Sequence, residues 1–299
     1  MLGYFGPAGT FTHQAMLSIT DADGVAFSSV GEALDAVRQG QVTGAVVPIE
    51  NSVEGGVSAT LDKLVDGDPL MITGEVVIPV EFGLYVRPGT SLGDVASVLT
   101  HGHAAAQCRD WLATMIPSAQ VTEAGSTAGA AKEVSDPASR YDAAICARVA
   151  GQLYELEELA YSIEDNPGAV TRFVVASRPG RLPERTGADK TTLVAYLHQD
   201  HPGALLEILQ QFAVRGVNLC RIESRPTKTL LGSYCFAIDA EGHLADRRLT
   251  ETLLGLHRIC RDVIFLGSYP RADAQPPDVR RGFDDESFEE AQAWLERLA

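Results

Sequence analysis

The chain has 299 residues, of which 45% are hydrophobic and 21% are charged, and this length and composition allow two or three packed cores. The formal net charge of −16 repels nucleic-acid phosphates and anionic membrane surfaces, so we expect neither as a partner. No stretch reaches the roughly 20 apolar residues that span a bilayer, and the start of the sequence lacks a basic, apolar secretion signal, so a cytoplasmic protein is expected.

Short β-rich runs alternate with helical stretches from residue 1 to about residue 177, which is typical of parallel βαβ units. The expected strands are Leu2–Phe5, Val25–Ser29, Gly44–Ile49, Met71–Val86, Ser97–His101, Val121–Ala124, Ala143–Ala147, Tyr161–Glu164 and Thr171–Ser177. The expected helices are Ala8–Ile19, Gly31–Gln39, Ala104–Met115, Ala128–Val134 and Val149–Leu159. The long run Met71–Val86 and a return near Leu159–Glu164 predict two crossovers between two lobes, roughly residues 1–76 plus 161–180 and residues 77–160.

A linker and a smaller domain are expected after these lobes. Residues 177–190 carry two prolines, two glycines and several charges without apolar periodicity, which predicts a linker. The order that follows is β-α-β-β-α-β, the ferredoxin-like arrangement. Its expected elements are Thr191–His198, Gly203–Arg215, Leu219–Ser224, Gly232–Asp239, Ala245–Cys260 and Val263–Gly267. Residues 271–299 form a tail with a short amphipathic helix that we expect to dock on the body or on a partner subunit.

Polar side chains recur where the expected strands of the first domain end. VPIENSVEGG (Val47–Gly56) carries Glu50, Asn51 and Ser52 after a buried strand, a favourable place for a ligand in an α/β sheet. LTHGHAAAQC (Leu99–Cys108) has the same order of features, with Thr100 and His101 at a strand end and Gln107 on the following helix. FGPAGTFTHQA (Phe5–Ala15) and the Ser126–Thr127 pair open helices, where backbone N–H groups can approach an anion.

Local structure alone is an alternative explanation for each of these segments. Asn51 or Ser52 can form an Asx-turn that caps the next helix, and Ser126 can be an ordinary N-cap. His101 and His103 lie near Cys108, but no third distant ligand accompanies them, so no metal site is expected. The cysteines are odd in number, widely spaced and without a CxxC pair, which predicts buried free thiols.

Together with DNPGAVTRFVVAS (Asp165–Ser177), these segments resemble the prephenate dehydratase family. The matching segments, in chain order, are FGPAGTFTHQA, VPIENSVEG, the stretch that ends in Gln107–Cys108, GSTAGAA and Thr171–Phe173. HPGALLEIL (His201–Leu209) and IESRP (Ile222–Pro226) then resemble the ACT regulatory domain that this family carries. The chain departs from the family at Gly102–His103, where a proline, a glutamine or both are common, and at Ala169, where asparagine is frequent; Asn166 is a candidate for that amide.

The resemblance implies an α/β fold with a two-lobed, periplasmic-binding-protein-like catalytic domain at residues 1–180 and a ferredoxin-like βαββαβ ACT domain at residues 190–270. It implies conversion of prephenate to phenylpyruvate in phenylalanine biosynthesis, without a cofactor or a metal. Thr171 is the leading candidate for donating a hydrogen bond or proton to the departing hydroxyl. The further catalytic candidates are Asn51, Gln107 and Thr100, and the expected substrate-binding residues are Ser52, Ser126, Thr127, Arg172 and Phe173. Because Arg172 faces away from Thr171 on a regular strand, a salt bridge that supports the cleft is its alternative role.

The same resemblance implies that phenylalanine regulates the enzyme. We expect it to bind between two copies of the ACT domain in a homodimer or homotetramer. The expected contacts are Gly203, Ala204, Leu205, Asn218, Leu219, Glu223, Ser224 and Arg225.

Three other classes of protein are alternatives to a monofunctional enzyme. A solute receptor would also use two lobes, but the secretion signal is missing and the Thr171–Phe173 triplet favours an enzyme. A non-enzymatic regulatory protein that binds aromatic amino acids would explain the second domain, although no helix-turn-helix or basic face is evident. A bifunctional enzyme would need an additional helical domain, and the chain is expected to be monofunctional.

Overall fold

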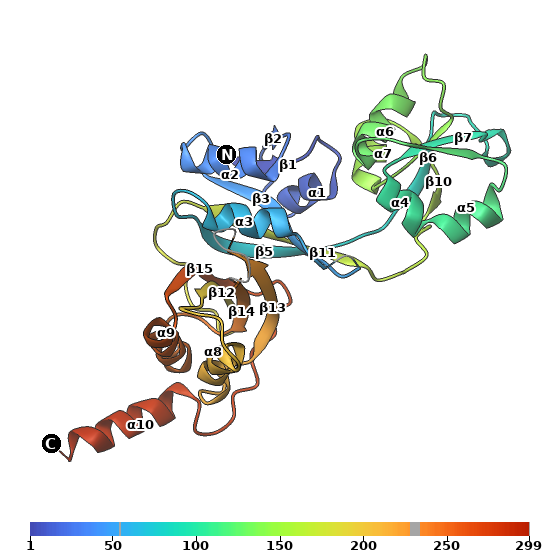
Figure 1. Ribbon diagram of the computed structural model, residues 1–299. Coiled ribbons are helices and arrows are strands. Elements are labelled where there is room, and N and C mark those ends of the chain that lie inside the picture. Colours follow the sequence, from blue (N-terminus) through green and yellow to red (C-terminus); the bar gives the residue numbers. More distant parts are fainter. Residues whose placement is uncertain (54, 228–233, 299) are drawn as a thin grey trace. The chain divides into compact units, whose positions relative to one another are not determined.

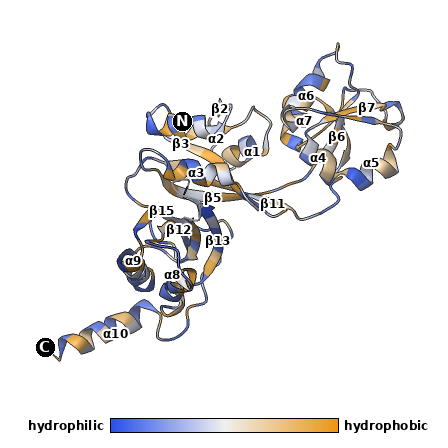
Figure 2. Ribbon diagram, viewed as in Figure 1, coloured by the Kyte–Doolittle hydropathy of each residue, from blue (hydrophilic) through white to orange (hydrophobic). Residues whose placement is uncertain are grey.

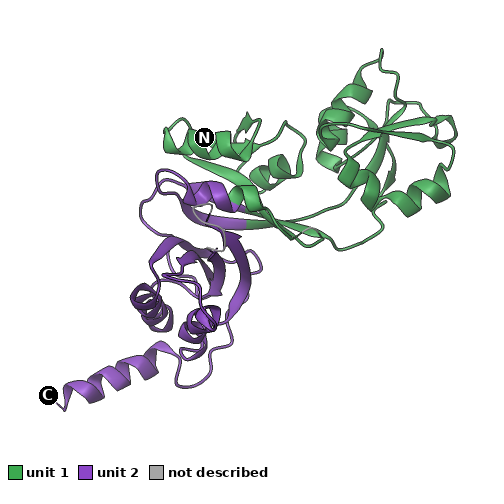
Figure 3. Cartoon of the chain, in the orientation of Figure 1, with its two compact units in different colours: residues 1–60, 76–173 green, residues 61–75, 174–299 purple. Residues whose placement is uncertain are grey.

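The computed structural model describes residues 1–53, 55–227 and 234–298 (Figure 1). The chain divides into two compact units, coloured separately in Figure 3. Unit 1 contains Met1–Thr60 and Val76–Phe173, and unit 2 contains Leu61–Glu75 and Val174–Ala299. These boundaries differ from the sequence-based domain limits of 1–180 and 190–270, which stay a prediction.

The described strands form three sheets. The first has the order β2-β1-β3-β11-β5 with β4 paired to β3, and the second has the order β10-β6-β9-β7-β8. The strands of the first sheet are β1 (Leu2–Phe5), β2 (Val25–Phe27), β3 (Gly44–Asn51), β4 (Gly55–Gly56), β5 (Met71–Pro79) and β11 (Val170–Ser177). Those of the second are β6 (Gly83–Val86), β7 (Ser97–Thr100), β8 (Gln120–Glu123), β9 (Ala143–Cys146) and β10 (Glu157–Tyr161).

These two sheets form the two predicted lobes, but their strands are not all parallel. β1 is parallel to β2 and β3, and β7 is parallel to β8 and β9, as βαβ units require. β6 is antiparallel to both β9 and β10. The connecting helices are α1 (Phe11–Leu17), α2 (Val30–Arg38), α3 (Ser58–Val65), α4 (Gly102–Gln107), α5 (Arg109–Met115), α6 (Thr127–Ser135) and α7 (Arg148–Leu153), with a 3₁₀ turn at Leu92–Asp94.

Buried aliphatic side chains hold the second lobe together on both faces of its sheet. Leu84, Val98 and Ile145 pack on one face with α4 and α5, while Leu99 and Val134 pack on the other with α6. Figure 2 shows the hydrophobic colour along β3 and around β7, where the strands are buried. Fully burying an aliphatic side chain of this size contributes about 1.5–3 kcal/mol.

Unit 2 contains the predicted ferredoxin-like arrangement, which is confirmed. Its sheet has the order β13-β14-β12-β15, and Leu193, Ile208, Phe212 and Leu249 are part of its core. The elements are β12 (Asp189–Tyr196), α8 (Ala204–Ala213), β13 (Leu219–Pro226), β14 (Tyr234–Glu241), α9 (Arg247–Ile259) and β15 (Asp262–Pro270). The expected start of the third strand, at Gly232 and Ser233, lies outside the described residues.

The tail helix α10 (Asp285–Glu296) was predicted, but it has no buried residue. Its bands of hydrophobic and hydrophilic colour are visible in Figure 2, and Trp294 and Leu295 are more than half exposed. The docking expected for this helix is therefore untested.

None of the described helices is both long and apolar enough to cross a membrane. The cysteines are free, as expected, and four of them are buried; Cys220 is exposed, contrary to prediction.

Candidate active site

A cavity of about 640 Å³ lies in unit 1 and is lined by residues from both of its sheets and their loops. This volume is within the range of small-molecule pockets. The apolar part of its wall comes from Phe5, Pro7, Phe11, Val80, Phe82 and Ala104. The polar part comes from Thr10, Thr12, Ser28, Asn51, His101, His103, Gln107, Ser126, Thr127 and Thr171.

Asn51 and Thr171 form a hydrogen-bonded pair on this wall, from the neighbouring strands β3 and β11. The Asn51 Nδ2 amide donates to Thr171 Oγ1 over 2.9 Å. Asn51 Oδ1 accepts from the Val53 backbone N–H over 2.8 Å, which fixes the orientation of the amide. Because Thr171 Oγ1 already accepts a hydrogen bond, its own O–H is available to donate to a ligand.

The first turns of three helices contribute to the same wall. Thr10 caps α1, His101 caps α4 and Ser126 caps α6 through their side chains. Helix starts carry partial positive charge and N–H groups without helical partners. The described wall contains no lysine or arginine, so an anion there would be held by N–H groups at the helix starts and by hydroxyl, amide and imidazole side chains.

Two aromatic rings close the apolar side of the pocket. Phe11 from α1 and Phe82 from the β5–β6 connection meet edge to face, with ring centroids 5.5 Å apart. This geometry is favourable for aromatic pairs and provides an apolar surface for a ring beside the polar donors.

The structure brings five of the predicted site residues into the pocket wall: Asn51, Gln107, Ser126, Thr127 and Thr171. The other four, Thr100, Ser52, Arg172 and Phe173, do not line it. Thr100 is fully buried and donates to the Ile145 carbonyl, and Phe173 is 2% exposed within the core. Ser52 Oγ accepts from the Val170 N–H. A substrate contact for these residues stays a prediction.

Arg172 lies in an ion pair. Its Nε donates to Glu50 Oε2 over 3.1 Å, and its side chain is only 8% exposed. An ion pair is the alternative to carboxylate binding that the sequence analysis left open, and the role of Arg172 toward the substrate stays a prediction.

Several wall residues were not predicted as site residues. Ser28 follows β2, so the rule that ligands bind beyond the carboxyl ends of parallel strands points to it. Thr10 and Phe11 lie inside the FGPAGTF segment that the sequence singled out. No sequence pattern indicated Phe82, because Met71–Val86 was predicted as one continuous strand.

The described residues contain no group of three or more His, Cys, Asp or Glu side chains placed to hold a metal ion. His101 and His103 lie close together, with ring centroids 5.0 Å apart. Burial raises the pKa of the nearby Cys108 thiol to about 12, so this sulfur is protonated near neutral pH and is a poor ligand. The absence of a metal requirement remains a prediction.

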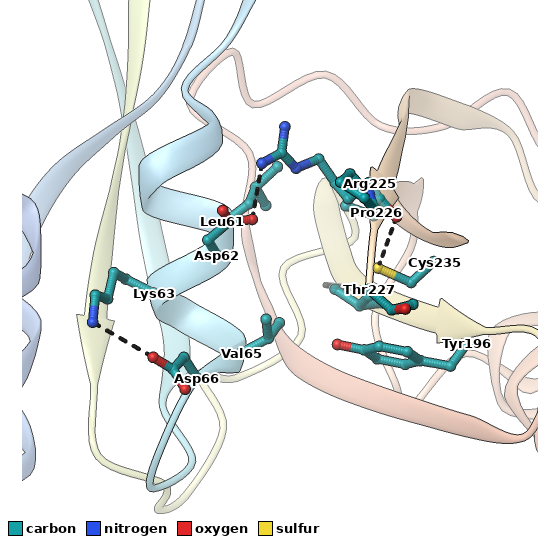
Figure 4. Close-up of a pocket in the computed structure, with 12 residues that line it drawn as sticks. Leu61, Asp62, Lys63, Val65, Asp66, Tyr196, Arg225, Pro226, Thr227 and Cys235 are labelled. Carbon is teal, nitrogen blue, oxygen red and sulfur yellow. Dashed lines mark hydrogen bonds and ion pairs between the residues drawn. The ribbon is translucent and has the colours of Figure 1, made fainter. Parts of the chain in front are cut away.

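The residues expected to bind phenylalanine lie in unit 2, and two of them, Ala204 and Arg225, border different cavities. Ala204 borders one of about 240 Å³. Arg225 borders another of about 520 Å³, between α3 and the sheet (Figure 4). Arg225 Nη2 is 3.0 Å from Asp62 Oδ1 of α3 in that cavity.

The remaining members of this set occupy the helix start and the sheet edge. Gly203 is the N-cap of α8 with a left-handed φ of 94°, a conformation that favours glycine. Leu205 and Ser224 are exposed, and Asn218, Leu219 and Glu223 lie at or on the edge strand β13. Binding of phenylalanine between two copies is not tested by a single chain.

Fold and pocket together define a two-lobed α/β protein with a polar small-molecule site, followed by a ferredoxin-like unit. The family model for prephenate dehydratase matches residues 2–181, more than half of the chain. The chain belongs to the prephenate dehydratase family, whose catalytic domain is of the periplasmic-binding-protein type and whose members are lyases that remove water and carbon dioxide.

Individual relatives agree with this membership over nearly the whole chain. The prephenate dehydratase of Amycolatopsis methanolica is 45% identical over 297 residues, which cover 98% of this chain and 96% of the relative. The crystal structure of prephenate dehydratase from Arthrobacter aurescens in complex with L-Phe has a TM-score of 0.93 and 50% identity, covering 100% of this chain and 99% of the other. A quorum-quenching acylase, GqqA, has a TM-score of 0.82 and 30% identity, covering 90% and 97%.

Proposed function

We propose that the chain converts prephenate to phenylpyruvate in the unit 1 pocket, with the Asn51–Thr171 pair as its catalytic centre. The observation that carries this proposal is the hydrogen bond from Asn51 Nδ2 to Thr171 Oγ1 at the pocket wall. It leaves the Thr171 O–H to donate toward a bound substrate.

The reaction breaks two bonds between the substrate ring and its substituents. The C–C bond to the ring carboxylate releases CO₂, and its electron pair enters the ring as the C4–O bond breaks and the ring becomes aromatic. The leaving group is hydroxide, which takes up a proton from the solvent and departs as water. Since the ring itself receives the electrons, the enzyme's task is to assist a poor leaving group and to orient a dianion.

In this proposal Thr171 donates to the departing oxygen. A threonine hydroxyl is a very weak acid, so its contribution is a preorganised hydrogen bond rather than complete proton transfer. Gln107, Ser126 and Thr127 complete a shell of neutral donors, and Phe11 and Phe82 face the ring. Neutral donors orient the carboxylate that is lost without stabilising it so strongly that its loss is slowed.

The proposal includes regulation by phenylalanine through an ACT domain at residues 190–270. Its support is the ferredoxin-like topology of this region and the L-Phe bound to the Arthrobacter aurescens relative. Phenylalanine binds a homodimer or homotetramer between two copies, at Gly203–Leu205 of one and Asn218–Arg225 of the other. Its binding shifts the pocket toward a less active state, by no more than the difference in its affinity for the two states.

The test is the rate at which purified protein forms phenylpyruvate from prephenate. Thr171→Ala is expected to lower kcat about a hundredfold, the range for a lost preorganised donor, with a smaller change in KM and an unchanged thermal midpoint. A folded Thr171→Ala protein with nearly normal kcat removes Thr171 from the mechanism.

Acylase activity is a second candidate, favoured by the similarity to GqqA. The discriminating experiment offers prephenate and an N-acylated substrate to the same preparation. Turnover of the acyl substrate alone would replace the dehydratase proposal.

A further inference from the structure

Three successive contacts join the end of β3 to the start of β11. The Ser52 backbone N–H donates to the Val170 carbonyl over 2.9 Å, Asn51 Nδ2 donates to Thr171 Oγ1 over 2.9 Å, and Arg172 Nε donates to Glu50 Oε2 over 3.1 Å. From one contact to the next, the residue number decreases by one on β3 and increases by one on β11, which is the pattern of two antiparallel strands. Each residue of one strand therefore has a defined opposite residue on the other.

The two side-chain pairs lie on opposite faces of the sheet, because successive side chains of a strand alternate. Asn51 and Thr171 line the pocket, whereas Glu50 and Arg172 do not. Arg172 is 7% exposed as a residue, while the Glu50 side chain is 38% exposed. A guanidinium this buried requires an ionic partner, so the Glu50 carboxylate restrains the position of Arg172.

We propose that Glu50 and Arg172 are positioning residues that hold Asn51 and Thr171 in register from the face of the sheet away from the pocket. This inference rests on the proposed catalytic role of Thr171. Glu50 is the chain neighbour of Asn51, and Arg172 is the chain neighbour of Thr171. A shift of β11 along β3 therefore moves Thr171 Oγ1 relative to the Asn51 amide. Misplacement of a reacting group by about 1 Å can lower a rate a hundredfold.

The first variant is Arg172→Met, which keeps most of the buried volume and leaves Glu50 to be solvated. We expect kcat to fall about tenfold, because positioning is impaired and not abolished, with KM changed less than about twofold. The decisive arm repeats the change in a Thr171→Val background. If the Glu50–Arg172 pair acts through Thr171, its loss has no further effect once Thr171 is replaced. Thr171→Val and the double variant Thr171→Val/Arg172→Met should therefore have the same kcat within about twofold.

A second variant, Glu50→Gln combined with Arg172→Met, removes both charges and leaves no unpaired buried cation. It should reproduce the loss in kcat with a wild-type thermal midpoint. The matched control is Asp35→Asn, which breaks an ion pair of unit 1 that also contains a largely buried arginine, Arg38, 2.8 Å from Asp35. This control should leave kcat unchanged.

A readout that does not depend on activity separates this inference from the proposed reaction. The Asn51 side-chain amide resonances, assigned by their loss in Asn51→Ala, should shift and exchange faster with solvent in Arg172→Met. If the wild-type protein shows no dehydratase activity, the proposed function is wrong, but the Asn51 resonances still test whether Glu50 and Arg172 fix the register of β3 and β11. Unchanged Asn51 resonances, an additive loss in the Thr171→Val background, or a raised KM with normal kcat would each overturn the positioning role.

Discussion

At the scale of single residues, the orientation of one amide decides whether the Thr171 hydroxyl is free to donate into the pocket. Asn51 Oδ1 is held by the Val53 N–H, so Nδ2 is the atom that reaches Thr171. This orientation makes Thr171 an acceptor toward Asn51 and a donor toward the pocket.

Asn51→Asp is the substitution that tests this orientation. The variant keeps the shape of the side chain but replaces the donor with a carboxylate, which must accept from Thr171 and repels a dianion. We expect a loss in kcat/KM at least as large as that of Asn51→Ala, on the order of a hundredfold. Steady-state kinetics of both variants provide the measurement, and a milder effect of aspartate than of alanine contradicts the assigned direction of the hydrogen bond.

His13 is a partly buried histidine of helix α1. Its Nδ1 accepts a hydrogen bond from the Gly9 N–H over 3.1 Å, and its ring stacks on Tyr4. Burial lowers the pKa of His13 below its ordinary value of 6.5, with Asp23 opposing the shift. The unfolded chain therefore binds the proton more tightly than the folded protein. The stability that neutral His13 contributes is present above about pH 6.5 and is lost as the pH falls below it.

Urea unfolding of the wild type and of His13→Gln, at about pH 7.5 and about pH 5.5, checks this sign. The free energy of unfolding of the wild type should fall more on acidification than that of His13→Gln. Equal pH dependence of the two proteins would show that His13 does not titrate as inferred.

Sequence reasoning expected Asn51, Ser126 and Thr127 at strand-to-helix junctions and Gln107 on the helix after a strand, and the family resemblance added Thr171, which lies at the start of β11. All five line the pocket. Sequence reasoning could not determine how deeply a hydroxyl is buried. Thr100 ends its strand as expected, yet its Oγ1 donates to Ile145 of the adjacent strand β9. That contact joins residues 45 positions apart, and no local pattern encodes it.

At the scale of elements, the ferredoxin-like order was predictable because helical and strand periodicities alternate clearly there. The expected helix Val149–Leu159 was wrong at its end: α7 stops at Leu153, Glu155 adopts a positive φ of 54°, and Glu157–Tyr161 form β10. Pairing with β6 overrides the local helical pattern. The expected helix Ala104–Met115 is divided at Cys108, and α3 was not predicted at all.

Helix α3 contacts both Arg225, an expected phenylalanine-binding residue, and Pro48 of the pocket strand β3. Asp62 on this helix pairs with Arg225 at the end of β13 (Figure 4). Thr60, two residues earlier and fully buried, donates to the carbonyl of Pro48 on β3. Pro48 precedes Asn51 on the same strand, and from these contacts we infer a route by which phenylalanine binding would affect Asn51 and Thr171.

Asp62→Asn is therefore expected to raise the phenylalanine concentration for half-inhibition about fivefold, within the usual range of coupling energies. Activity without phenylalanine should be unchanged. Asp66→Asn is the matched control, because Asp66, just after α3, borders the same cavity but pairs with Lys63 of α3. An unchanged inhibition curve for Asp62→Asn contradicts the route through α3.

At the scale of the whole molecule, the two compact units do not follow the chain order that a linker suggests. Leu61–Glu75 belongs to the unit that contains the ferredoxin-like sheet, and Lys190 Nζ pairs with the buried Glu75 carboxylate at 2.8 Å. The sequence places the linker after residue 177, but it gives no indication that an earlier segment packs with the later domain. Ion pairs between residues 115 positions apart are invisible to local patterns.

If the chain breaks two bonds of prephenate in one overall reaction, phenylpyruvate and CO₂ form in equal amounts, and a measurement of both products checks this. Purified protein is given prephenate labelled in the ring carboxylate, and phenylpyruvate and labelled CO₂ are measured over the same time course, with Thr171→Val in parallel. We expect equal amounts of the two products from the wild type and a rate reduced about a hundredfold in the variant. Absence of phenylpyruvate with the wild type, or equal rates from both proteins, would contradict this expectation.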